Sequence, residues 1–163
     1  GRGKLKKVII HTDGGCEPNP GPGGWAAVIR YNSEVQEISG GEENTTNNRM
    51  EMTAVIKALE ALHEPHEVEL YTDSEYLCKG MMEWLPMWKA KGRLQKGSVK
   101  NADLWQRIDE LMSRHLVKCY WVKGHAGNTD NERCDKLAYE EIKKIYKQKG
   151  QTPPPPIQMR LIS

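Results

Sequence analysis

The sequence has almost no excess of charge of either sign. Its 163 residues include 24 lysines and arginines and 22 aspartates and glutamates, which leaves a net charge of +2. This balance excludes a polycationic binder of the histone type, so any affinity for nucleic acid has to come from a local basic cluster. No apolar run approaches the roughly 20 residues that a membrane-spanning helix needs. The basic start, GRGKLKK, leads into only a few apolar residues and lacks the pattern of a secretory signal.

Cysteine is sparse, and its spacing excludes the common zinc motifs. The four cysteines are scattered and none forms a CxxC pair, which disfavours a zinc site. A domain of this size needs no disulfides to be stable, so we expect reduced thiols and a cytoplasmic location. Disulfide pairing is the weaker alternative. The cysteines are Cys16, Cys78, Cys119 and Cys134.

Strand and helix patterns alternate along the chain, as in an α/β domain. Short β-rich runs predict strands, and a turn-rich stretch at 18–24 precedes a hairpin centred on residues 32–33. Helices packed on the faces of a mixed sheet follow from this alternation. The expected strands cover 7–13, 25–31, 34–39, 67–73 and 117–122, and the expected helices cover 48–63, 74–91, 102–114 and 130–149.

The last thirteen residues differ in composition from the rest of the chain. Residues 151–163 contain four consecutive prolines, which favour an extended segment that cannot join the sheet. We therefore expect one domain over residues 1–150 and a flexible tail over 151–163. The sequence assigns no role to this tail.

Two aspartates end two of the expected strands in the same way. Residues 10–14 (IHTDG) and 70–74 (LYTDS) both close an apolar run with Thr-Asp and a small residue. If these strands are parallel neighbours about 4.8 Å apart, Asp13 and Asp73 lie at the carboxyl edge of the sheet and could share a cation. Each residue alone also has a local explanation, because Asp73 could cap the next helix and Asp13 could begin a turn.

Glu51 is an acid on the apolar side of an expected helix. Projection of residues 48–63 gives an apolar stripe from Val55 to Leu62, and Glu51 falls within it. An unpaired carboxylate that faces a core is strongly unfavourable, so something has to neutralise it. Either Glu51 folds back in a capping box with Asn48, or it reaches the cation between the two aspartates.

Two further polar residues lie near the end of the chain. Asp135 lies at the margin of the apolar stripe of the last helix, where a capping box between Thr129 and Glu132 leaves it without a capping role. His125 lies in a Gly-His-Ala-Gly loop, where an imidazole could move protons near neutral pH. Both could also be ordinary surface residues. Carboxylates without a thiolate or imidazole pair suit a hard cation such as Mg²⁺ or Mn²⁺, and two ions if the site is wide enough.

The basic residues are concentrated between residues 79 and 100, which hold six lysines and arginines and one glutamate. Trp84 and Trp88 are four residues apart and share one helical face. Cations beside flat aromatic surface are typical of contact with nucleic acid. The alternative is a core role for the tryptophans and solvated lysines, although Gly92 and Gly97 favour a projecting loop.

These motifs together resemble those of the type I ribonucleases H, from about residue 6 to residue 149. The resemblance implies an α/β ribonuclease H-like fold, with a five-stranded mixed sheet in the order 3-2-1-4-5 flanked by helices. It also implies a monomeric endonuclease that uses two Mg²⁺ ions, or Mn²⁺, to hydrolyse the RNA strand of RNA/DNA hybrids, leaving 5′-phosphate and 3′-hydroxyl ends. The segments that carry it are TDGGCEPNPGPGGW (12–25), TTNNRMEM (45–52), YTDS (71–74), VKNADLW (99–105) and VKGHAGNTDNERCD (122–135).

The same resemblance implies roles for individual residues. The catalytic, metal-binding carboxylates are Asp13, Glu51, Asp73 and Asp135, and the loop histidine that assists deprotonation or product release is His125. The residues that contact the hybrid fall into three groups. They are Cys16, Asn19, Asn47 and Asn48 in the minor groove, Thr46 and Asn101 at a DNA phosphate, and Trp84, Trp88, Lys89 and Lys91 in the basic protrusion along the DNA strand.

Two departures from the family pattern bear on substrate affinity rather than on chemistry. Arg93 stands where well-known bacterial members have a third tryptophan, and Asn44 stands where the family has an arginine. Three rival functions stay open: a binding module with an inactive site, a nuclease of the same fold acting on DNA, and a fragment of a reverse transcriptase. The four carboxylates disfavour the first rival. The TTNNRME segment and the complete protrusion favour a stand-alone, hybrid-cleaving enzyme.

Overall fold

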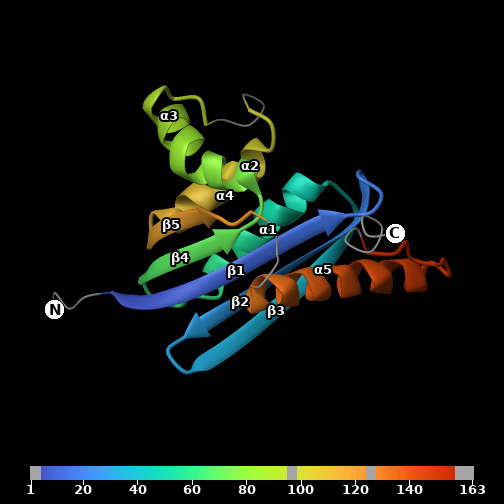
Figure 1. Cartoon of the computed structure of the whole chain (residues 1–163). Helices are drawn as coiled ribbons and strands as arrows, with labels where there is room; N and C mark the ends of the chain where they lie inside the picture. The colour runs from blue at the N-terminus through green and yellow to red at the C-terminus, as the bar shows by residue number, and fades with distance from the viewer. Residues whose placement is uncertain (1–4, 95–98, 124–127, 157–163) are drawn as a thin grey trace.

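The computed structural model describes residues 5–94, 99–123 and 128–156 (Figure 1). Its five strands form one sheet in the order β3-β2-β1-β4-β5, which confirms the expected order. None of the helices in these ranges is long and apolar enough to span a membrane. The elements are β1 (Lys6–Cys16), β2 (Gly21–Tyr31), β3 (Glu34–Thr45), α1 (Asn47–Glu60), β4 (His66–Thr72), α2 (Glu75–Lys79), η1 (Gly80–Trp84), α3 (Leu85–Ala90), α4 (Ala102–Met112), β5 (Leu116–Trp121) and α5 (Thr129–Gln148).

The sheet is mixed. Strand β1 pairs antiparallel with β2, which pairs antiparallel with β3, while β1 and β4 and then β4 and β5 pair in parallel. Tyr31 pairs with Glu34 across a two-residue loop, which confirms the expected hairpin, and Asn32 adopts the positive φ of 40° that such a loop favours.

Strand β2 begins earlier than the sequence predicts. The glycines of the expected 18–24 connector already belong to the strand, where Gly24 pairs with Gly15. A side chain on Gly24 would overlap the carbonyl oxygen of Ala138 in α5. The prediction was wrong because these glycines permit close packing of a helix on the strand, which is a tertiary effect.

Helices cover both faces of the central part of the sheet (Figure 1), while the edge strands β3 and β5 stay largely exposed. On one face, α1 and α4 enclose the larger core with residues such as Ile29, Leu59 and Trp105. On the other face, Cys134 and Ala138 of α5 form a smaller core with two residues of β2. Successive residues of β2 therefore enter opposite cores, as expected for a strand covered on both sides.

The single helix expected over 74–91 is three consecutive helical segments, with the π-helical turn η1 in the middle. Gly80 starts this turn because a side chain there would overlap the Trp105 ring. Pro86 has no N–H to donate to the preceding turn, which also favours an irregular helix.

The capping residues of α1 and α5 also differ from the prediction. The Thr46 hydroxyl accepts a hydrogen bond from the Arg49 N–H (3.2 Å), and the Asn128 side chain accepts one from the Asn131 N–H (2.9 Å). Both caps have the extended backbone that this position requires, whereas the residues expected to cap, Asn48 and Thr129, already belong to the helices. The capping box that offered Glu51 a local role therefore does not exist.

Candidate active site

The two Thr-Asp strand ends meet at one edge of the sheet. In the parallel β1–β4 pair, His11 lies opposite Tyr71, which brings Asp13 and Asp73 side by side. Strand β1 does not end at Asp13 as expected but continues to Cys16. Asp13 is buried, and the Gly14 N–H donates to its Oδ1 at 2.9 Å. Asp73 does not cap the next helix, because the Ser74 hydroxyl does so. The indole N–H of Trp121 instead donates to the Asp73 carbonyl oxygen at 3.1 Å.

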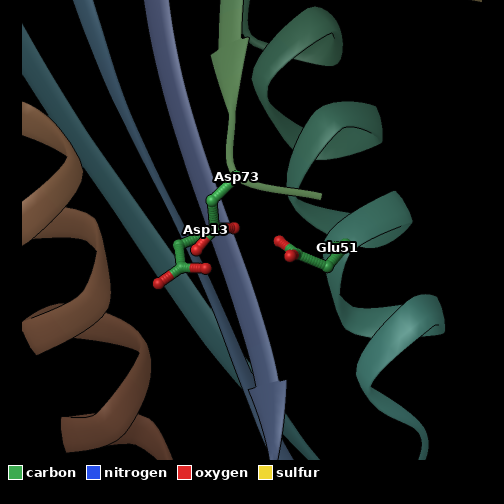
Figure 2. Close-up of side chains that lie close together, drawn as sticks. All are labelled: Asp13, Glu51 and Asp73. Carbon is green, nitrogen blue, oxygen red and sulfur yellow. The ribbon is translucent and has the colours of Figure 1, made fainter. Parts of the chain in front are cut away.

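Glu51 lies on helix α1 and points toward the two aspartates. Helix α1 lies close against β1 because Gly14 has no side chain there: an added Cβ would overlap the backbone of Met50 and Glu51. Figure 2 shows Glu51 reaching from α1 toward the two aspartates. One oxygen from each of Asp13, Glu51 and Asp73 lies within 4.8 Å of the others.

Glu51 lies beside two other acids. Its side chain is buried, and its Oε1 has no hydrogen-bond partner. Burial, and then the neighbouring charges of Asp13 and Asp73, raise the pKa of Glu51 well above its usual value. Positive charge placed in the cluster would oppose this shift and favour the ionised carboxylate.

The surroundings of the cluster fit a hard divalent cation. The three carboxylates open into a pocket of about 290 Å³ that they line together with Glu17 and Asp135. Among the described residues that line it, none is a lysine, arginine or histidine. The cluster itself offers carboxylate oxygens, which match the preferences of Mg²⁺ or Mn²⁺.

Asp135 reaches the pocket from α5, on the face of the sheet opposite Glu51. Its neighbour Cys134 is fully buried, and the Cys134 thiol donates to the His11 carbonyl oxygen at 3.2 Å, which fixes the helix beside β1. Asp135 is half-buried and lies outside the tight group of three described carboxylates. The structure therefore brings all four predicted acids to one pocket but places Asp135 at its margin. His125 lies outside the described residues.

The residues expected in the minor groove gather beside this pocket. The Asn19 side-chain amide donates to the Asn47 Oδ1 at 2.8 Å, and that oxygen also accepts from the Asn48 N–H at 2.9 Å. Cys16 lines the pocket but is buried, and its thiol lies 3.2 Å from the Thr45 carbonyl oxygen. Burial raises the pKa of the Cys16 thiol.

Asn101 is held by residues that the sequence did not single out. It has a left-handed backbone (φ 61°), its Oδ1 accepts from the Arg49 guanidinium at 3.2 Å, and its amide donates to the Tyr76 hydroxyl at 3.2 Å. Arg49 also forms a two-point ion pair with Asp103. Arg49 lies within the TTNNRMEM motif and could have been found there, whereas Tyr76 gave no such signal.

The tryptophans of the basic protrusion are half-buried rather than fully projecting. Trp84 lies between Tyr76 and Trp88, with ring centroids 5.4 and 6.1 Å apart, and Trp88 contacts Trp105 at 5.9 Å. Both tryptophans pack against the larger core while part of each stays exposed. The alternative of a core role for these residues is therefore partly correct.

The lysines of the same segment are exposed. Lys89 forms an ion pair with Asp109 at 3.1 Å, and the Lys91 side chain is open to solvent. Both can meet a charged ligand from outside.

The comparison with known proteins matches this architecture. The RNase H family model matches residues 5–143. This chain belongs to the RNase H family. Membership in the RNase H family confirms the resemblance read from the motifs and the predicted enzyme class, a ribonuclease H.

Relatives in the RNase H family cover most of this chain. The ribonuclease H of Chelativorans sp. (strain BNC1) is 53% identical over 148 residues, which is 90% of this chain and 91% of the relative. The ribonuclease H of Brucella anthropi is 54% identical over 138 residues, which is 83% of this chain and 90% of the relative.

Two solved RNase H structures share the fold. LC9-RNase H1, a type 1 RNase H with the type 2 active-site motif, superposes with a TM-score of 0.76 at 28% identity, over 94% of this chain and 77% of that chain. LC11-RNase H1, solved in complex with an RNA/DNA hybrid, has a TM-score of 0.65 at 28% identity. The match covers 84% of this chain and 97% of that chain.

Proposed function

We propose that this chain hydrolyses the RNA strand of RNA/DNA hybrids, leaving 5′-phosphate and 3′-hydroxyl ends. The observation that carries the proposal is the group of three carboxylates from β1, α1 and the residue after β4, two of them buried, in a pocket without a basic residue among its described lining. Acids placed beside a phosphodiester repel it, so a protein that only bound the hybrid would have no use for them. A relative of the same fold, LC11-RNase H1, was solved in complex with an RNA/DNA hybrid.

Asp13, Glu51 and Asp73 would hold the metal, with Asp135 completing the ligands of a second ion. When bound, two Mg²⁺ ions (or Mn²⁺) would supply the charge that acidifies a water and offsets the charge on the leaving 3′-oxygen. Asp13 would help to hold both ions, because β1 packs against both α1, which carries Glu51, and α5, which carries Asp135.

The remaining chemistry belongs to residues around the cluster. Burial holds Asp13 and Glu51 in place before substrate arrives, so little reorganisation of these two carboxylates is needed during reaction. We assign His125, which precedes α5 in the sequence, to deprotonation or product release.

Strand selection would come from the surface beside the pocket. The linked side chains of Asn19, Asn47 and Asn48 offer amide donors and acceptors suited to 2′-hydroxyls and base edges. Thr46 and Asn101, which both contact Arg49, would hold a phosphate of the DNA strand.

The exposed Lys89 and Lys91, with Trp84 and Trp88, would follow the DNA strand farther along the hybrid. The proposal includes a monomer that acts in the cytoplasm.

Cleavage of three end-labelled duplexes tests this function. RNA/DNA hybrid, double-stranded RNA and double-stranded DNA are incubated with the protein in Mg²⁺ and in EDTA. Asp13→Asn is the inactive variant, and Glu64→Gln, an exposed acid in the loop before β4, is the matched control. We expect cutting of the hybrid's RNA strand alone, only in Mg²⁺, and only by the parent and Glu64→Gln. Tight binding of the hybrid without cutting in Mg²⁺ or Mn²⁺ would leave the binding module as the function.

A further inference from the structure

The proline-rich segment that follows α5 folds back along that helix (Figure 1). Gly150 ends the helix with a positive φ of 70°, and the Gln151 N–H then donates to the Tyr146 carbonyl oxygen at 2.9 Å. Farther along, the Pro154 carbonyl oxygen accepts a hydrogen bond from the Tyr139 hydroxyl at 2.7 Å. Tyr139 lies about three turns before the end of α5, so residues 151–156, called here the strap, run antiparallel to the helix.

The strap ends at the catalytic pocket. Pro155 and Pro156 line the same pocket as Asp13, Glu51 and Asp73. Prolines have no backbone N–H, so the strap cannot pair with the neighbouring β1–β2 loop and contributes only ring carbons and carbonyl oxygens there. These groups offer a phosphate no hydrogen-bond donor, so the strap forms part of the pocket wall without a group that would bind the substrate.

We propose that the strap is an autoinhibitory element that competes with the hybrid for the carboxylate pocket. This proposal rests on the proposed function, because it takes a phosphodiester of the RNA strand as the competitor. The cleaved phosphate has to approach Asp13, Glu51 and Asp73, and the rings of Pro155 and Pro156 stand at the wall of the space it would enter.

Few interactions hold the strap in place, so a ligand can displace it. Its six residues, QTPPPP, carry no charge, so none of them forms an ion pair with the acids of the pocket. One side-chain hydrogen bond, from Tyr139, fixes its middle. A hybrid that also contacts the exposed lysines and asparagines of the neighbouring surface can replace these contacts.

Competition of this kind has a defined kinetic signature. If only a fraction of the molecules has an open pocket, the apparent affinity for substrate falls by that fraction, while the rate of the bound complex is unchanged. A strap that is closed nine-tenths of the time raises KM about tenfold.

Two variants that loosen the strap in different ways test the proposal. One ends at Gly150, and the other, Tyr139→Phe, keeps the strap but removes its hydroxyl donor. Tyr120→Phe, on the exposed part of β5, is the matched control. We expect KM for the hybrid to fall about three- to tenfold in the shortened chain and by a smaller factor in Tyr139→Phe, with kcat unchanged. An unchanged or higher KM in both variants would overturn autoinhibition.

A structural readout separates this proposal from the proposed function. Nuclear Overhauser contacts between the Tyr139 ring and Pro154 should be present in the free full chain and lost when excess hybrid is added in EDTA. If they are lost but no variant cuts the hybrid, the strap stands and the proposed nuclease function fails. If they are absent from the free protein, or persist when the hybrid is saturating, the strap is overturned whatever the activity.

Discussion

The carboxyl of Glu51 combines three conditions that seldom occur together in a stable protein: full burial, two neighbouring acids and an oxygen without a hydrogen-bond partner. These conditions raise its pKa in the folded state above the value of about 4.5 expected for the unfolded chain. A raised pKa means that the protonated form is stabilised by folding. Its favourable contribution is therefore complete below pH 4.5 and is lost as the pH rises through the folded pKa.

Replacing this charge should stabilise the metal-free protein. Glu51→Gln keeps the shape of the side chain, so we expect the free energy of unfolding in EDTA at neutral pH to rise by about 1–3 kcal/mol. The gain should shrink as the pH falls toward 4.5. Urea denaturation across this pH range measures it, with the exposed Glu64→Gln as control. A Glu51→Gln protein less stable than the parent at neutral pH in EDTA would show that Glu51 is neutralised within the protein.

Substitution of the four acids should lower kcat to different extents. Asp13 belongs to the tight group of three, whereas Asp135 is half-buried at the margin of the pocket. We therefore expect Asp13→Asn to lower kcat on the hybrid by at least about 100-fold and Asp135→Asn to lower it less. Steady-state kinetics in Mg²⁺ compares the two. Equal losses would mean that Asp135 moves into the group when substrate binds.

Some of this site could be predicted from residue patterns alone. The repeated Thr-Asp strand ends predicted the pairing of Asp13 with Asp73, and the place of Glu51 in an apolar stripe predicted its burial. The position of Asp135 at the margin of the pocket could not be predicted, because it depends on how closely α5 packs on the sheet. The hydrogen bonds that hold Asn101 were also out of reach, since they join side chains more than 20 residues apart.

At the scale of elements, the site depends on how closely α1 approaches β1. Gly14 permits the contact, since a side chain there would overlap the backbone of Met50 and Glu51, whereas a side chain on Gly15 would meet nothing within 4 Å. Gly14→Ala should therefore displace α1, destabilise the protein by about 1–3 kcal/mol and lower kcat/KM on the hybrid. Gly15→Ala is the matched control and should resemble the parent in both.

Denaturation curves and cleavage rates of the two alanine variants give the comparison. Similar effects at Gly14 and Gly15 would show that the α1–β1 contact is not limiting.

The sequence predicted which elements form better than where they begin and end. Short β-rich runs located β1, β4 and β5, and the hairpin pattern located β2 and β3. The π-helical turn at Gly80 and the early start of β2 were missed. Both depend on glycines that lie against residues distant in sequence, Trp105 and Ala138, and no local pattern reports such contacts.

At the scale of the whole molecule, the fold brings residues 13, 51, 73 and 135 to one pocket, and the end of the described chain returns to it as well. Sheet order and helix packing produce the first convergence, and the family motifs predicted it. The strap could not be predicted, because a run of prolines specifies an extended segment but not the surface on which it lies.

Divalent cations should stabilise the whole fold through the same pocket. A ligand that binds only the folded state adds about 2.7 kcal/mol at 100 times its Kd. We therefore expect the Tm of the parent to rise with Mg²⁺ concentration, and that of Glu51→Gln to rise much less. Calorimetric melting in a Mg²⁺ series, with EDTA as reference, measures this. An equal rise in both proteins would place the ion elsewhere.

The central claim is that the three clustered carboxylates cut the RNA strand of a hybrid, and single-turnover cleavage by their amide variants tests it most directly. Asp13→Asn, Glu51→Gln and Asp73→Asn are compared with the parent and Glu64→Gln on an end-labelled hybrid in Mg²⁺, after melting in EDTA has shown that each is folded. The account predicts a loss of at least about 100-fold in all three and none in Glu64→Gln. Cleavage at the parental rate by any one of the three would contradict it.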